Sequence, residues 1–299
     1  MILNEKQLPL RAWRSLALSV VVLLVWDVLV TVLYLADVTH FDAIDIQFTL
    51  FGTVIALFVG FMVNAAYGRW WEARTLWGQV VNSSRSLARQ ALVLVDDTGV
   101  HATPGLATQV VRNQVAYVHV LRTSLRKQPL PAEAALFLGP ARLAELERVT
   151  NRPAAVLLDT DRLLSEAHRR GMLGELSRLE LEATLVALTD AQGGLERIRN
   201  TPLPVQYRFL PRFFSRVFCL ILPFAVVEDL GWLTPLGSGL VGLMFLMAVQ
   251  IGDQLANPFA DGVYDVPMTA ITRTIQIDLT EMLGDEPPRP VEPVEQVLY

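Results

Sequence analysis

The sequence predicts an all-α integral membrane protein with four transmembrane helices and a helical cytosolic domain. Of its 299 residues, 52% are hydrophobic and only 18% are charged, and the apolar residues gather in long runs. Soluble chains carry about 25% charged residues, so this chain has too few polar side chains to cover a water-facing surface. The net charge of −5 offers no general attraction to nucleic acid. With one cysteine and four histidines, disulfide scaffolds and the usual zinc cages are excluded.

The first apolar run covers residues 15–36 and contains one charge, Asp27. About 20 apolar residues cross the hydrocarbon of a bilayer, so we expect a retained transmembrane helix here. Basic residues precede the run and acidic residues follow it, which predicts a cytosolic N-terminus. An ionisable group in mid-membrane costs several kcal/mol. Asp27 is therefore either a proton or ion site or a structural hydrogen-bonding partner, and the sequence favours neither.

The second run, residues 46–68, carries no charge and predicts a second span that returns the chain to the cytosol. Gly52, Ala56 and Gly60 recur every four residues, a spacing that suits close helix packing. A neighbouring stripe, Thr53, Leu57 and Phe61, has the same spacing and shares one side of the helix. Taken alone, such a stripe more often contacts lipid or a protein core. In a ring of identical subunits it would instead form stacked rings that gate ions by dewetting.

The remaining chain divides by composition into four further stretches. Residues 69–212 hold most of the charges and predict a cytosolic helical domain. Residues 213–252 predict the third and fourth spans, with an outer turn at Glu228 and Asp229, although the apolar run of the third span is short. Residues 253–284 predict a cytosolic loop and helix, and the Pro-rich residues 285–299 an extended or disordered tail.

A dense aromatic and charged cluster follows the second span. It contains Arg69, Trp70, Glu72 and Arg74, together with further tryptophans that include Trp77. Tryptophan is favoured at the membrane boundary because its ring is apolar and its N–H reaches water. Arg69 and Glu72 have the spacing of a helical ion pair that could orient the exit of the second span. We expect this cluster to act in structure first and in gating second.

Three segments carry a family resemblance: GFMVNAAYGRWWEARTLWG at 60–78, TPLP at 201–204, and IGDQLANPFADGVYDVP at 251–267. They resemble the signature regions of the bestrophin channel family, in the same order over nearly the whole chain. The resemblance implies a homopentameric ion channel with one central pore through membrane and cytosolic parts. Animal members conduct chloride under calcium control, whereas some bacterial relatives favour monovalent cations.

Carried over by position, the resemblance places the hydrophobic neck of the pore on Thr53, Leu57 and Phe61. Thr53 departs from the apolar pattern, and a hydroxyl wets a narrow pore more readily. A second, cytosolic aperture is implied near Ser177. The calcium-binding stretch of animal members falls on residues 261–265, which hold two carboxylates, too few for the six to eight oxygens that calcium takes. We therefore expect no calcium gating, no metal and no cofactor.

Asp42 and Asp45 are predicted at the outer mouth, where rings of carboxylates would concentrate cations. No motif for bond-making chemistry is present, so the prediction is a pore-forming subunit in the bacterial inner membrane, with both termini cytosolic and monovalent ions as permeants. Two alternatives stay open: an ion-coupled carrier that uses Asp27, and a membrane-anchored sensor of a small molecule.

Overall fold

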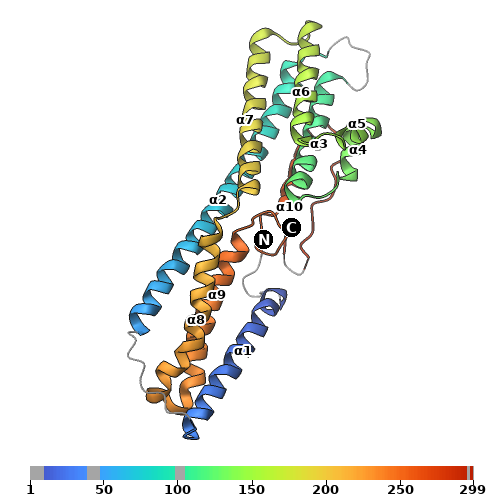
Figure 1. Cartoon of the computed structure of the whole chain (residues 1–299). Helices are drawn as coiled ribbons and strands as arrows, with labels where there is room; N and C mark the ends of the chain where they lie inside the picture. Colours follow the sequence, from blue (N-terminus) through green and yellow to red (C-terminus); the bar gives the residue numbers. More distant parts are fainter. Residues whose placement is uncertain (1–9, 39–47, 98–104, 295–296, 299) are drawn as a thin grey trace. The chain divides into compact units, whose positions relative to one another are not determined.

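The computed structural model describes residues 10–38, 48–97, 105–294 and 297–298. These residues are mostly helical, and the described part of the chain contains no named strand (Figure 1). The chain forms two compact units. The span-bearing unit comprises Ile2–Trp70 and Pro202–Pro258, and the helical unit comprises Trp71–Thr201 and Phe259–Tyr299. The long helix α2, Phe48–Leu94, contributes residues to both.

The span-bearing unit packs four helical segments together. They are α1 (Leu10–Leu35), the first half of α2, α8 (Val205–Leu230) and α9 (Thr234–Leu255), with the short 3-10 helix η1 (Gly231–Leu233) between the last two. Three segments of the described chain are long and apolar enough to cross a membrane: Leu16–Leu35, Phe48–Leu94 and Val205–Leu255. The third contains both α8 and α9, so the short apolar run predicted for the third span belongs to a helix of 26 residues.

The chain reverses between α8 and α9 later than the sequence suggested. Glu228 and Asp229, expected in the outer turn, instead occupy the last turn of α8. The reversal follows at Gly231, whose φ of +49° suits a residue without a Cβ. The two prolines at 202 and 204 lie between two helices, since α7 ends at Asn200 and α8 begins at Val205.

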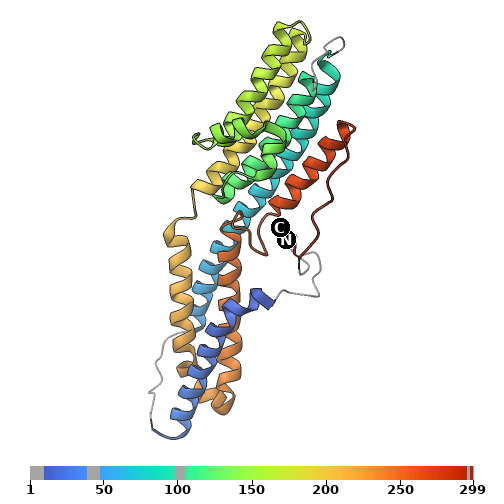
Figure 2. The same ribbon diagram turned by 90° about the vertical axis from the view of Figure 1, so that its right-hand side faces the viewer.

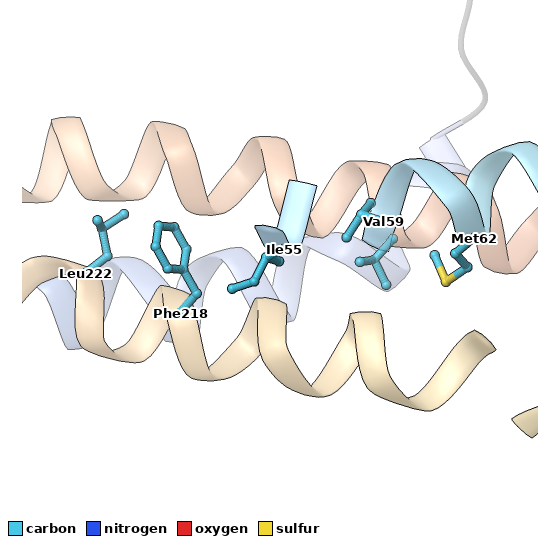
Figure 3. Packing of buried hydrophobic residues seen from close by; sticks show 6 residues of the cluster. Ile55, Val59, Met62, Phe218 and Leu222 are labelled. Atoms are coloured by element: carbon cyan, nitrogen blue, oxygen red, sulfur yellow. The ribbon is translucent and has the colours of Figure 1, made fainter. Parts of the chain in front are cut away.

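The core of the span-bearing unit lies where α2, α8 and α9 meet. Its buried members are Ile55, Val59, Met62, Phe218, Leu222 and Val249 (Figure 3). Glycines bring the backbones close: a Cβ on Gly252 of α9 would stand 2.6 Å from Met62 Cε, and one on Gly242 would stand 2.3 Å from Leu23 of α1. Close approach through small residues is the usual means of packing helices in lipid. The one cysteine of the chain, Cys219, is buried beside Gly242 and is not in a disulfide.

The helical unit gathers the second half of α2 with six other helices. They are α3 (Leu106–Arg126), α4 (Ala132–Leu138), α5 (Pro140–Leu146), α6 (Arg152–Arg169), α7 (Glu175–Asn200) and α10 (Met268–Met282). The α10 helix lies in the helical unit (Figure 2), where it packs against α3. An ion pair of 2.6 Å between Arg85 and Asp278 ties it to α2. Helix α7 crosses α2 closely, because a Cβ on Gly194 would stand 2.8 Å from Leu76 Cδ1.

Trp77 corrects one expectation about the aromatic cluster. The sequence placed it among residues that anchor the membrane boundary, but its side chain is fully buried in the helical unit. Ala73 and Val80 are also fully buried, so the three share one inward face of α2 at spacings of three and four residues. Helical position therefore decides that Trp77 packs in a core.

Candidate pore-lining face

Thr53, Leu57 and Phe61 lie on the side of α2 that faces away from its own packing partners. Leu57 and Phe61 keep 56% and 55% of their surface exposed, and Thr53 is exposed as well. Ile55 and Val59, in contrast, are 2% and 4% exposed. Leu57 is two residues from each of these, about 200° around the helix. The predicted neck residues thus form one continuous face that the span-bearing unit itself does not cover.

The hydroxyl of Thr53 is already engaged within α2. Its Oγ1 donates to the carbonyl oxygen of Thr49 at a distance of 2.7 Å. Threonine in membrane helices commonly satisfies its hydroxyl proton on the preceding turn in this way. Because the hydroxyl proton is already in this hydrogen bond, Thr53 presents a less polar surface than a free hydroxyl would. The polarity that the sequence predicted at this position of the neck is therefore smaller than expected.

The small residues of α2 at four-residue spacing, Gly52, Ala56 and Gly60, lie in two different environments. At Gly52 a Cβ would stand 3.2 Å from the ring of Phe218, which is the close packing that the spacing predicted. At Gly60 nothing lies within 4 Å of that position. Gly60 instead lines an apolar groove of about 840 Å³ between α2 and α9, together with Ala56 and Phe245. Only the first part of the stripe is therefore used for packing inside this unit.

The middle of α2, around Arg69, makes side-chain contacts. Arg69 Nε donates to the carbonyl oxygen of Ala256, just after α9, at 3.3 Å. The ring of Trp70 stacks on Tyr67 with centroids 6.2 Å apart. The contact of Arg69 joins α2 to the end of α9, whereas the stacked pair of Tyr67 and Trp70 lies within α2.

The next residues of the cluster belong to the helical unit. Glu72, expected to pair with Arg69, forms an ion pair with Arg197 near the end of α7. Arg74 is exposed, and its guanidinium extends along α2 toward the C-terminal end, to 3.9 Å from the position of a Cβ on Gly78. The ion pair of Glu72 therefore holds α7 against α2, a contact that spacing along one helix could not reveal.

Asp27 is fully buried in the span-bearing unit, between α1 and α9. Its Oδ2 would lie 3.5 Å from a Cβ on Gly239, and Ser238 lies beside it. The hydroxyl of Ser238 donates to the carbonyl oxygen of Thr234, and no described residue is hydrogen-bonded to either carboxyl oxygen of Asp27. The side chain of Asp27 is therefore buried where α1 packs on α9, whereas Thr53, Leu57 and Phe61 form an exposed face of α2.

Three predicted site residues remain: Ser177, Asp42 and Asp45. Ser177 is half-buried in the first turn of α7, in the helical unit. Asp42 and Asp45 lie outside the described residues, so the outer mouth has no structural description. The described chain contains no group of three or more histidine, cysteine or acidic residues placed to hold a metal ion.

The loop that matches the calcium-binding stretch of animal bestrophins is occupied by internal contacts. Arg126, at the end of α3, has a side chain only 6% exposed and places Nη2 2.5 Å from Asp261 Oδ1. Asp265 accepts a hydrogen bond of 2.5 Å from the backbone N–H of Gly262, and burial raises the pKa of this carboxyl group. Both carboxylates are thus engaged by the protein. Sequence reasoning missed Arg126, because nothing in its local pattern connects it to a loop so distant along the chain.

The helical arrangement and the long apolar segments define a membrane protein built from bundled α-helices. A family model described as "Bacterial/Fungal Bestrophin protein" matches residues 7–281. The chain belongs to this bestrophin family. Membership agrees with the predicted class, an ion channel of the membrane and not an enzyme.

Individual relatives point the same way. "Voltage-dependent anion channel-forming protein YneE" of Escherichia coli K12 is 36% identical over 238 residues, 79% of this chain and 75% of that protein. "Voltage-dependent anion channel-forming protein RSc3414" of Ralstonia nicotianae is 35% identical over 239 residues, covering 80% and 77%. The bacterial bestrophin homologue of Klebsiella pneumoniae is similar in structure, with a TM-score of 0.83 at 28% identity, covering 91% of this chain and all of that one.

Proposed function

We propose that the chain is the pore-forming subunit of a bestrophin-like channel for small monovalent ions, with α2 lining the pore. The observation that carries the proposal is the exposed face of Thr53, Leu57 and Phe61, set opposite the buried face of the same helix. Several copies around an axis would turn this face into stacked, mostly apolar rings, which close a pore by excluding water. The proposed assembly is a pentamer, following the family resemblance.

The proposed topology has four spans, α1, the first half of α2, α8 and α9, in the bacterial inner membrane. Both termini are cytosolic in this proposal, as are residues 69–212 and 253–284. The proposed second aperture lies near Ser177 in the first turn of α7, where the neighbouring Leu176 is 80% exposed. The residues after 284 form the Pro-rich tail, to which we assign no function.

Gating in this proposal does not depend on calcium. The two carboxylates of the candidate loop are already bound by Arg126 and by a backbone N–H, and calcium would have to displace a buried guanidinium from Asp261. Calcium normally takes six to eight oxygen ligands. Single-channel activity should therefore be the same with and without micromolar calcium, and a steep calcium response would contradict this part of the proposal.

Two observations bear on ion selectivity, and they favour opposite signs. The names of the relatives in Escherichia coli and Ralstonia nicotianae support anion conduction. The carboxylates of Asp42 and Asp45, predicted at the outer mouth, favour cations. Reversal potentials in asymmetric sodium chloride distinguish the two, because the sign of the shift reports which ion carries the current.

The experiment that tests the function is reconstitution of the purified full-length protein into a planar bilayer. A channel gives discrete unitary currents, and the mass of the detergent-free oligomer gives the number of copies. The carrier alternative predicts saturable, coupled flux without unitary steps. Asp27 gives it no support, because its side chain is fully buried against α9. Absence of current from correctly assembled protein would overturn the channel proposal and favour the sensor alternative.

A further inference from the structure

Three arginines form a column along one side of α8 at its first turns. Arg208, Arg212 and Arg216 follow each other at intervals of four residues, so they lie one above another on the helix. The column extends about 12 Å along the axis, at 1.5 Å per residue. It ends directly before Val217, where the apolar run of the helix begins. Lys and Arg concentrate near the cytoplasmic ends of spans, so the column belongs at the inner membrane interface.

The positive charge of this column is only partly neutralised. Asp253 of α9 is the only carboxylate of the described chain within ion-pair distance of it: it pairs with Arg212 and stands 3.8 Å from Arg208 Nε. Arg216 is exposed and forms no ion pair with a described residue. The Nε groups of Arg208 and Arg212 are buried and have no hydrogen-bond acceptor among the described residues. Three guanidinium groups thus share one carboxylate and retain unused donors.

The column faces away from the proposed pore. Phe214 and Phe218 of α8 pack in the core where α8 meets α2. Arg216 lies two residues from each of them, so it points to the opposite side of α8. Exposed aromatic rings accompany it: Phe209 and Phe213 are 57% and 48% exposed and stack with centroids 5.7 Å apart. Exposed apolar rings beside arginines that are only partly neutralised suit a surface that is covered partly by acyl chains and partly by headgroups.

We propose that the Arg208–Arg212–Arg216 column binds the phosphodiester headgroup of an anionic phospholipid at the inner leaflet, with Phe209 and Phe213 against its acyl chains. Guanidinium groups bind phosphate oxygens through paired, charge-assisted hydrogen bonds. Basic sites beside spans on the cytoplasmic side attract anionic headgroups in the same way. This inference rests on the proposed topology, in which α8 begins at the cytosolic side of the membrane, but it does not depend on ion conduction.

The test compares lipid retention by wild type and Arg216→Gln, using native mass spectrometry of the intact purified oligomer. Phosphatidylglycerol and phosphatidylcholine are titrated separately, and inorganic phosphate is added in a third arm. Wild type should retain phosphatidylglycerol in preference to phosphatidylcholine, and Arg216→Gln should weaken that binding about fivefold. Arg216→Lys, which keeps the charge but loses the paired geometry, should fall between the two. Arg148→Gln, an exposed change in the helical unit, is the matched control and should match wild type.

Three results would overturn the proposal. Equal retention of the two lipids would show that the headgroup charge is not recognised. Displacement of phosphatidylglycerol by millimolar inorganic phosphate would show a site for a free anion. A smaller oligomer mass for Arg216→Gln would show that Arg216 pairs with a second copy of the chain. None of these measurements uses ionic current. A failure of the lipid-binding proposal is therefore distinguishable from a failure of the channel proposal.

Discussion

Acidification should loosen the contact between α3 and α10 through His119. The imidazole is 1% exposed, and its Nε2 lies 3.1 Å from Gln276 Oε1 on α10. Burial lowers the pKa of His119 to about 4, and the charges of Arg122 and Arg273 act in the same direction. The hydrogen bond to Gln276 and the charge of Glu133 oppose the shift. The closed structure therefore favours the neutral imidazole.

The size of the pH effect follows from the difference in the pKa of His119 between the closed and the locally opened chain. In the open state His119 has its ordinary pKa of about 6.5, so the open state binds a proton at higher pH than the closed state does. The stabilisation is complete above about pH 6.5 and is lost as the pH falls from 6.5 toward 4. Between pH 7.5 and 5.0 the free energy of opening should fall by about 2 kcal/mol, or roughly 30-fold in the opening equilibrium.

Hydrogen exchange of the full-length protein in detergent measures this equilibrium at the amides of α3 and α10. After correction for the intrinsic pH dependence of exchange, wild type should lose about 30-fold protection between pH 7.5 and 5.0. The His119→Gln variant keeps a hydrogen-bond donor for Gln276 but has no group that titrates at this position. It should therefore lose far less protection over the same pH range. Asp265, whose pKa is raised by burial, acts in the opposite direction at lower pH, but it is present in both proteins. Equal loss of protection in the two would refute the role of His119.

Three further changes test the neck, the buried acid and the loop. Leu57→Ser should raise the current of a single open channel in a planar bilayer, because a ring of hydroxyls is wetted more readily than a ring of leucine; an unchanged current would remove Leu57 from the neck. Asp27→Asn should leave oligomer mass, current and the pH dependence of the current unaltered, since its carboxyl group faces α9 and no described cation pairs with it; a changed pH profile would restore the proton-site interpretation. Arg126→Met should lower stability by about 2 kcal/mol, below the 3–5 kcal/mol of a fully buried pair because Asp261 is partly exposed. Thermal unfolding in detergent checks this, with Asp261→Asn as a milder companion that leaves the guanidinium bonded to Thr269.

The sequence predicted the long apolar helices well because apolar length is a strong physical signal. A helix must satisfy its own backbone hydrogen bonds in a bilayer, so about 20 apolar residues leave few other structures. The break between α7 and α8 at Pro202 and Pro204 has a similarly local cause, since proline removes a donor from the helix. Periodicity also identified which residues of α2 share a face, but not which face is buried. That required the contacts of Ile55 with α8.

What the sequence did not predict depends on contacts between distant residues. Glu72 has a possible partner three residues away in Arg69, yet it pairs with Arg197, 125 residues along the chain. Trp77 looked like a membrane anchor by residue type, whereas its position on α2 places it in a core. Residue type and local spacing describe what a side chain can do. The packing of the helices decides which of these options is realised.

Because Cys219 is the only cysteine and is buried, the chain offers almost no background to reagents that modify thiols in water. A cysteine introduced in place of Leu57 would carry its only exposed thiol. A charged, membrane-impermeant thiol reagent would label that sulfur if the face of α2 borders an aqueous path, and would not reach it within hydrocarbon. Leu18 of α1, which is 72% exposed, offers the comparison position for a surface in contact with lipid. The native protein therefore has the low labelling background that is needed to test, residue by residue, whether the exposed face of α2 borders water.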